Sequence, residues 1–344
     1  MARSLAFWLD EPSGNPKIEL HFNYWSLDSS QVEYLDIGVK LSMEGAYKSI
    51  NFYLPFDTQK IGYVAELGEK VCSHDELLSA IFNSTVKNNA TVDNDIHDIT
   101  FSKGDSLRFF SQILKEEPKS PGGVQIKPLD EGDAKKGTTI CFPADLLNIK
   151  NSTTNKEDIP THGYFRFRIE LNEEGKKSIS HLYKPKDSWI TNHFEKVEMV
   201  DFRVNEARNL PKKIQSKLQL DSHILAIHFF LIREADSEFK MSHDDFHRCR
   251  ILEKDLWDNY LYLKDTTEKK TPDQMLIYHW KGGGATSTTN IDHFSAFAKF
   301  TRRHVRKRDI LLAIIFIVLL GACGSHLSTW LWKISENNVE CIED

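Results

Sequence analysis

Four basic residues are the best candidates in the sequence for binding an anion. Arg166 and Arg168 alternate with apolar residues, so in a strand both side chains project from the same face. Two neighbouring guanidinium groups can hold a phosphate or a carboxylate through charge-assisted hydrogen bonds. Lys176 and Lys177 follow in a predicted turn. We predict that these four residues bind a small anionic ligand, with an ordinary solvated sheet face as the alternative.

A second group of residues has the types needed for metal chemistry. In the segment HDDFH, His243 and His247 are four residues apart, and the segment is similar to the zinc-peptidase motif HExxH with Asp244 in place of the glutamate. Aspartate is one methylene shorter than that general base, and spacing identifies no third ligand. Ser242 and Asp245 instead favour a plain helix start, because acids offset the positive end of the helix dipole. We expect no metal or other cofactor, and keep His243 and His247 as the only metal candidates.

Positioning these side chains requires a folded soluble part, which we predict to be an α+β domain built mainly of antiparallel sheet. Apolar and polar residues alternate with period two, the pattern of a strand with one buried face. The first three predicted strands, residues 17–26, 37–43 and 50–56, are expected to form a meander, and residues 165–171 and 178–183 are expected to form a hairpin. Further strands are predicted at residues 96–101, 138–142, 196–208 and 223–233, the last of them central because it is almost continuously apolar. The predicted helices are residues 73–83 and 242–263.

Composition divides the chain into modules. We assign residues 1–280 to the soluble domain, with an internal boundary in the Pro- and Gly-rich stretch 115–136 as an alternative. Residues 281–290, KGGGATSTTN, are small and polar, as in flexible linkers. The glycines lack the spacing of a phosphate-binding P-loop, so we interpret this stretch as a linker.

Residues 291–309 combine aromatic and basic side chains. The pattern predicts an amphipathic helix on the membrane surface, with aromatic rings at the interface and bases against anionic headgroups. A last core helix of the soluble domain is the alternative. The predicted membrane-surface residues are Phe294, Phe297, Phe300, Arg302, Arg303, Arg306, Lys307 and Arg308.

The length and apolar composition of residues 310–332 predict a single transmembrane helix. They contain no acid or base other than His326, and a helix of this length covers about 34 Å, enough to cross a hydrocarbon core of about 30 Å. The bases before it and the acids after it favour a cytoplasmic soluble domain and a short outer tail, residues 333–344. The N-terminal residues do not resemble a signal peptide, so we expect a tail-anchored protein of the cell (inner) membrane.

Small residues form a stripe on the predicted anchor. Gly321, Ser325 and Ser328 recur at helical spacing, and such stripes let two helices approach closely. His326 lies beside them, and an ionisable group within a membrane span normally faces protein or water. We therefore predict a homo-oligomer formed through the transmembrane helix.

Charge and cysteine content limit the classes of partner. Residues 1–298 carry 37 basic and 45 acidic residues, a net charge of −8, which argues against a broad nucleic-acid-binding face but not against a local anion pocket. The five cysteines have no paired spacing, as expected for a reduced cytoplasmic domain. The expected partners are the lipid bilayer, further copies of the chain and a cytoplasmic protein.

The leading hypothesis is a non-enzymatic sensor or effector, because no complete catalytic signature is present. Its cytoplasmic domain would bind a partner protein or a nucleotide-like anionic signal, and its anchor would oligomerise to act at the membrane. By layout alone, the chain is similar to membrane-tethered effectors of prokaryotic antiviral defence. The alternatives are a membrane-anchored metal-dependent hydrolase or nuclease, and a structural tether or adaptor for a cytoplasmic complex.

Overall fold

The computed structural model describes most of the chain. The described residues are 3–27, 32–42, 45–57, 63–64, 66–93, 95–114, 123–129, 137–147, 160–183, 195–218, 223–262, 272–283, 290–303 and 307–340. One compact unit comprises residues 1–183 and 197–301, and a second comprises residues 184–196 and 302–344. The residues on both sides of the stretch 115–136 belong to the first unit.

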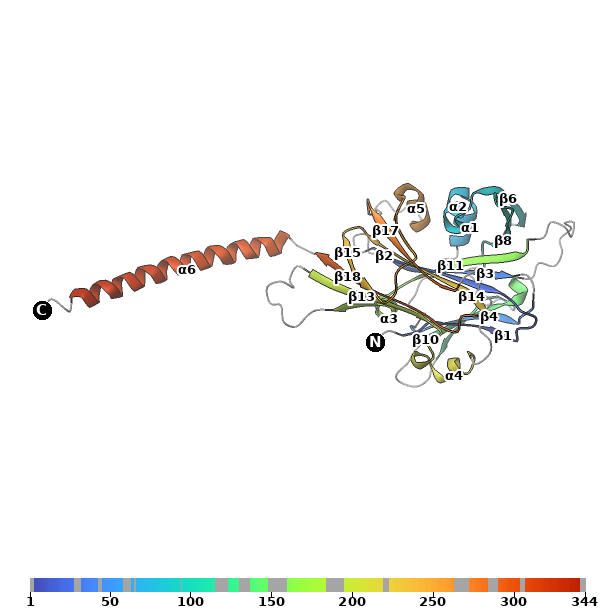
Figure 1. Ribbon diagram of the computed structural model, residues 1–344, viewed down its shortest axis with the longest axis horizontal. Coiled ribbons are helices and arrows are strands. Elements are labelled where there is room, and N and C mark those ends of the chain that lie inside the picture. The colour runs from blue at the N-terminus through green and yellow to red at the C-terminus, as the bar shows by residue number, and fades with distance from the viewer. Residues whose placement is uncertain are drawn as a thin grey trace. The chain divides into compact units, whose positions relative to one another are not determined.

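A mixed sheet of ten strands, counted over the described residues, forms the centre of the first unit (Figure 1). Its order is β16-β17-β14-β2-β3-β11-β8-β7-β6, and β5 pairs with β11. The pairs β2–β14 and β8–β11 are parallel, and the other pairs are antiparallel. The strands are β2 (Ile18–Leu27), β3 (Val32–Ser42), β5 (Tyr63–Val64), β6 (Val86–Asp93), β7 (Ile96–Phe101), β8 (Ser106–Phe110), β11 (His162–Glu170), β14 (Ile224–Glu234), β16 (Arg248–Leu252) and β17 (Met275–Gly283).

Two smaller sheets complete the strand content of the described chain. Their orders are β1-β4-β10-β9 and β12-β13-β18-β15. An isolated bridge between Leu5 and Val204 joins the segments before β1 and at the end of β13. The strands are β1 (Ala6–Asp10), β4 (Ser49–Leu54), β9 (Gln125–Leu129), β10 (Gly137–Pro143), β12 (Ser180–Tyr183), β13 (Glu195–Val204), β15 (Ser237–Ser242) and β18 (Phe294–Arg303).

The alternation seen in the sequence places two different environments on the two faces of the large sheet. Phe22 of β2, Ile37 of β3 and Phe167 of β11 project to one face and pack with residues of both smaller sheets in the main hydrophobic core. The opposite face packs against three helices, α1 (Leu67–Cys72), α2 (Asp75–Phe82) and α5 (Lys254–Leu261). The remaining helices of the first unit are α3 (Glu173–Ile179) and α4 (Lys212–Gln215). Asp36 of β3, Arg166 of β11 and His21 of β2 project to the helix-covered face.

A buried charge network ties β3, β11 and α5 together on the helix-covered face. The carboxylate of Asp36 accepts hydrogen bonds from Arg168 Nε at 2.6 Å, Tyr260 Oη at 2.6 Å and Trp25 Nε1 at 2.8 Å. Arg166 donates to Tyr260 Oη at 2.7 Å. Burial would raise the pKa of the Asp36 carboxyl, but the two guanidinium groups hold that pKa below its ordinary value.

A second buried acid lies on the core face of β3. Glu33 receives a hydrogen bond from Ser26 at 3.3 Å and pairs with Lys176 at 3.1 Å, beside Tyr24 and Glu198. Burial raises the pKa of Glu33 to about 7, despite the opposing effect of Lys176. Glu33 is therefore protonated at a pH where an exposed glutamate would be ionised.

Three predicted elements are wrong. Residues 178–183 do not form a hairpin with 165–171, because residues 173–179 form helix α3 and β12 pairs with β13 in another sheet. The helix expected from Ser242 does not form there: β15 ends at Ser242, the edge strand β16 follows, and α5 begins only at Lys254. Residues 50–56 supply β4, which joins a smaller sheet rather than a meander with β2 and β3.

The predicted juxtamembrane helix is a strand. Residues 294–303 form β18, which lies between β13 and β15. Phe294 and Phe300 are buried core residues rather than membrane-facing ones, and Phe297 is half-buried on the alternate face. Arg302 is also half-buried; residues 304–306 and the side chains of Arg303, Lys307 and Arg308 lie outside the described part of the chain.

The predicted linker begins inside a strand. Gly282 and Gly283 end β17, where they pair with β14. Gly283 has a φ of 65°, and a Cβ atom there would collide with the Leu225 carbonyl oxygen, so glycine is required by local geometry. Residues 284–289 lie outside the described residues.

One helix in the described part of the chain is long and apolar enough to cross a membrane. Helix α6 (Lys307–Glu340) contains the 20-residue segment Ile314–Lys333, with a mean hydropathy of 1.8 and none of it buried. A core helix of a soluble protein of this apolarity would be covered by other parts of the fold. The exposed apolar surface agrees with the predicted transmembrane helix.

We predict that Asp36→Asn destabilises the fold by about 3–5 kcal/mol, because Arg168 is left buried without its counter-charge. Urea unfolding of the full chain in detergent, followed by tryptophan fluorescence, measures the change. The double variant Asp36→Asn/Arg168→Met should lose clearly less free energy of unfolding than the two single variants lose together. Additive effects would show that the two groups do not stabilise each other.

We predict that Glu33 makes the protein less stable as pH rises from about 4.5 to about 7. In this window the unfolded chain has released the Glu33 proton and the folded chain has not, so the free energy of unfolding falls with pH, by at most about 1.4 kcal/mol per pH unit. Glu33→Gln should flatten this part of the stability–pH curve, as measured by urea unfolding at a series of pH values. Gln at the exposed Glu170 is the control and should leave the slope unchanged.

Candidate anion-binding pocket

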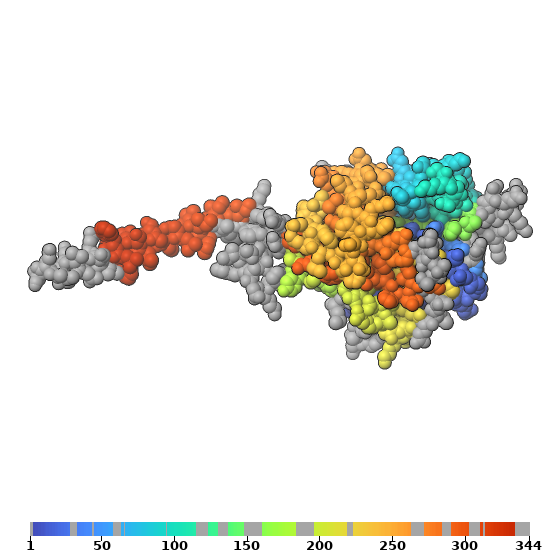
Figure 2. Space-filling model, viewed as in Figure 1, coloured from blue at the N-terminus to red at the C-terminus, as the bar shows by residue number. Residues whose placement is uncertain are grey.

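The helix-covered face of the large sheet contains a cavity of about 400 Å³. Its floor is formed by side chains of β2, β3, β11, β14, β16 and β17, and its walls include the end of α2 and Trp257 of α5. Figure 2 shows the α2 region (cyan) beside the α5 region (gold), and the two helices contact each other. The lining residues are Glu19, His21, Asn23, Lys40, Ala80, Ile81, Phe82, Asn83, Arg166, His228, Phe230, His247, Arg248, Arg250, Trp257, Ile277, His279 and Lys281.

Strand register brings four histidines into this pocket. His21 of β2 and His228 of β14 are paired in adjacent parallel strands, and their rings lie 5.0 Å apart. His228 Nδ1 is 3.0 Å from His279 Nε2, a hydrogen bond between β14 and β17. The ring of His247, from the segment before β16, lies 5.3 Å from that of His279. Residues more than 200 positions apart in the sequence thus form one imidazole cluster.

Three of these histidines are held in the neutral form. Burial lowers the pKa of His21 well below its ordinary value, and neighbouring His228 and Arg166 lower it further. Burial and Lys281 lower the pKa of His228 to about 4, and burial and His228 lower that of His279 to about 3. Neutral imidazoles retain a nitrogen lone pair at physiological pH.

The fixed charges around the pocket are predominantly positive. Lys40, Arg166, Arg248, Arg250 and Lys281 are the cationic lining residues. The only carboxylate lining it, within the described residues, is Glu19, which pairs with Lys40 at 3.1 Å. Arg250 also pairs with Glu253 at 3.4 Å, so its charge is partly offset. The balance still favours an anionic ligand.

Two buried donors in the pocket lining have no hydrogen-bond acceptor among the described residues. They are Nη2 of Arg166 and Nε1 of Trp257. Arg166 Nη2 lies 3.8 Å from Asp36, an ion-pair distance but too long for a hydrogen bond. The other Arg166 nitrogens are committed, because Nε donates to Tyr260 and Nη1 donates to Tyr164 Oη at 3.1 Å. Buried donors normally have acceptors, so Arg166 Nη2 and Trp257 Nε1 are candidate donors to a ligand oxygen.

Gly38 of β3 makes room for this arrangement. It is paired with His21 on one side and with Arg166 on the other. A Cβ atom at Gly38 would collide with the Tyr164 hydroxyl. That hydroxyl is 3.5 Å from His21 Nδ1, so glycine allows Tyr164 to contact His21 and Arg166 together.

The structure divides the anion-binding residues expected from sequence. Arg166 lines the pocket, whereas Arg168 is engaged by Asp36 and by the backbone carbonyls of Tyr260 and Leu261. Neither arginine is solvated. Lys176 lies on α3 and pairs with Glu33, whose side chain projects to the core face of the sheet, and Lys177 is exposed on the same helix.

The HDDFH residues do not share a helix face. His243 is exposed and contacts Asp244 at 3.2 Å, and only His247 reaches the pocket. The sequence analysis did not identify Glu19, His21, His228 and His279 as site residues. Their signal was present, because His228 interrupts an otherwise apolar central strand and Glu19 and His21 share one face of another.

No model of a known protein family matches the chain, and no curated protein matches it. Among solved structures, the chain is similar to the NMR structure of the Mycobacterium tuberculosis LppM protein folded domain, with 8% sequence identity and a TM-score of 0.20. The alignment covers 85% of this chain and 92% of that one. A similarity at this level assigns neither a fold nor a function.

Proposed function

We propose that the protein is a membrane-tethered receptor whose soluble domain binds a small phosphate-bearing ligand in the cationic pocket. The two buried donors without acceptors, Arg166 Nη2 and Trp257 Nε1, are the observation that carries this proposal. A ligand oxygen that accepts from them removes the free-energy cost of leaving them unpaired. Phosphate oxygens suit this role because they also compensate the surrounding positive charge.

The size and the walls of the pocket favour a small organic anion over a bare ion. A cavity of about 400 Å³ is within the usual range for small-molecule sites. Phe82, Phe230 and Trp257 supply aromatic surface beside the charged residues. A nucleotide-like molecule combines an aromatic base with phosphate groups and matches both features.

The remainder of the proposal concerns helix α6. We propose that the segment Ile314–Lys333 anchors the protein in the cell membrane, with the soluble domain in the cytoplasm. Ligand binding would favour assembly through the stripe of Gly321, Ser325 and Ser328, with His326 beside it. Clustering on a membrane raises effective concentration, so a modest binding free energy is sufficient to shift the population towards oligomers.

Anion binding is tested with inorganic pyrophosphate and ATP as probes, using isothermal titration of the full chain in detergent. We expect saturable binding that weakens with salt, and no binding of uncharged adenosine. Arg248→Gln and Lys281→Gln should each weaken pyrophosphate binding about 3- to 10-fold by removing a cation from the pocket rim. Lys177→Gln is the matched control, because this lysine is exposed on α3 and does not line the pocket.

If Lys177→Gln lowers pyrophosphate affinity as much as the pocket variants do, binding depends on overall charge and not on this pocket. Saturable binding that none of these changes affects would place the ligand elsewhere.

Assembly is tested with the double variant Gly321→Ile/Ser325→Ile. Bulky side chains on the stripe should prevent close helix approach and convert oligomers in detergent to monomers, as measured by light scattering. Unfolding of the soluble domain should be unchanged. Oligomers of unchanged size would exclude the stripe as the contact surface.

A further inference from the structure

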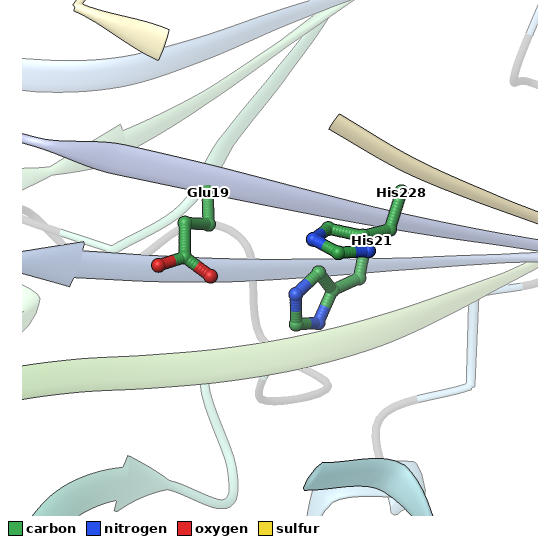
Figure 3. Close-up of side chains that lie close together, drawn as sticks. All are labelled: Glu19, His21 and His228. Atoms are coloured by element: carbon green, nitrogen blue, oxygen red, sulfur yellow. The ribbon is translucent and has the colours of Figure 1, made fainter. Parts of the chain in front are cut away.

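Three side chains in the pocket converge as a set of metal-ion ligands. One donor atom from each of Glu19, His21 and His228 lies within 4.8 Å of the others, and all three residues are half-buried (Figure 3). Glu19 and His21 are two residues apart in β2, so they share a face, and His228 lies opposite His21 in β14. Rigid neighbouring strands therefore hold the set, not a loop.

The neighbouring hydrogen bonds leave one nitrogen of each imidazole available. When His228 Nδ1 donates to His279 Nε2, the lone pair of His228 Nε2 is available to a metal ion. His21 Nδ1 faces the Tyr164 hydroxyl at 3.5 Å, which leaves His21 Nε2 available. Orienting contacts of this kind are typical of histidine ligands in metal sites.

We propose that Glu19, His21 and His228 bind one divalent transition-metal ion of the Zn²⁺ type, with at least one coordination position open to the pocket. Two imidazoles and one carboxylate suit such ions, and three protein ligands leave a position for water or a ligand oxygen. His279 orients His228. The ion lies among the cationic side chains that line the proposed phosphate site.

The surrounding positive charge opposes metal binding, and this repulsion predicts that metal and phosphate binding are coupled. Lys40 competes for the Glu19 carboxylate at 3.1 Å, and Arg166 and Lys281 also line the pocket. A bound phosphate offsets this repulsion and can supply an oxygen ligand. We therefore expect pyrophosphate to raise the affinity for the metal, and the metal to raise that for pyrophosphate by the same factor. This coupling rests on the proposed function, whereas metal binding itself does not.

The test titrates the full chain in detergent with Co²⁺, whose visible absorption reports coordination, followed by displacement with Zn²⁺. We expect one equivalent to bind. His228→Gln and His21→Gln should each lower metal affinity 100-fold or more, and Glu19→Gln about 10-fold. His279→Phe, which preserves stacking on Phe230 but removes the acceptor for His228, should lower it 10- to 100-fold. His243→Gln is the control for adventitious binding, because that histidine is exposed outside the pocket.

Lys40→Met provides a test with the opposite sign and without loss of a ligand. It frees the Glu19 carboxylate and removes a positive charge, so metal affinity should rise while pyrophosphate affinity falls.

The proposal is overturned if no metal binds at one equivalent, or if His243→Gln lowers metal affinity as much as His228→Gln. Metal binding without pyrophosphate binding would contradict only the proposed function, and the reverse would contradict only the metal site.

Discussion

The pocket depends on the buried carboxylate of Asp36. Its two oxygens engage Arg168, Tyr260 and Trp25, and so fix strand β11 and helix α5 against β3. Tyr260 in turn holds Arg166 at the pocket wall. A buried ion pair with good geometry and complete hydrogen bonding is costly to break from one side, which makes this contact a strong positional constraint. Through Tyr260 this contact holds helix α5, which carries Trp257, and helps to position Arg166 in the pocket lining.

The same constraint explains how positive and neutral groups coexist in a small space. Arg166 keeps its charge because Asp36 and two tyrosine hydroxyls surround it. Burial lowers the pKa values of the nearby imidazoles of His21 and His228 and favours their neutral forms; Arg166 lowers the pKa of His21 further, and Lys281 lowers that of His228. The pocket therefore contains both imidazole lone pairs and cationic side chains. Phosphate and a transition-metal ion are complementary occupants: the metal ion binds to the imidazole lone pairs, and the phosphate offsets the positive charge of the metal ion and of the cationic side chains.

Sequence patterns predicted the local structure better than the site. Period-two alternation located β2, β3 and β11, because one face of each strand packs in the core. For the polar face of β11 the same reasoning offered ligand binding or solvation, and it did not predict that Arg166 and Arg168 are buried next to Asp36. Pairing of His21 with His228 depends on a parallel contact between distant strands, which no local pattern reveals. For β18, buried Phe294 and Phe300 together with nearby bases imitated an amphipathic helix.

The most direct measurement is ¹⁹F NMR of the full chain labelled with 5-fluorotryptophan, titrated with pyrophosphate. The seven tryptophan signals are assigned by single substitution to Phe. If the pocket binds phosphate through its buried donors, the Trp257 signal shifts with saturation and the Trp25 signal, whose indole N–H is already bonded to Asp36, moves far less. A Trp257 signal that stays in place while pyrophosphate binds would contradict the assignment of this pocket.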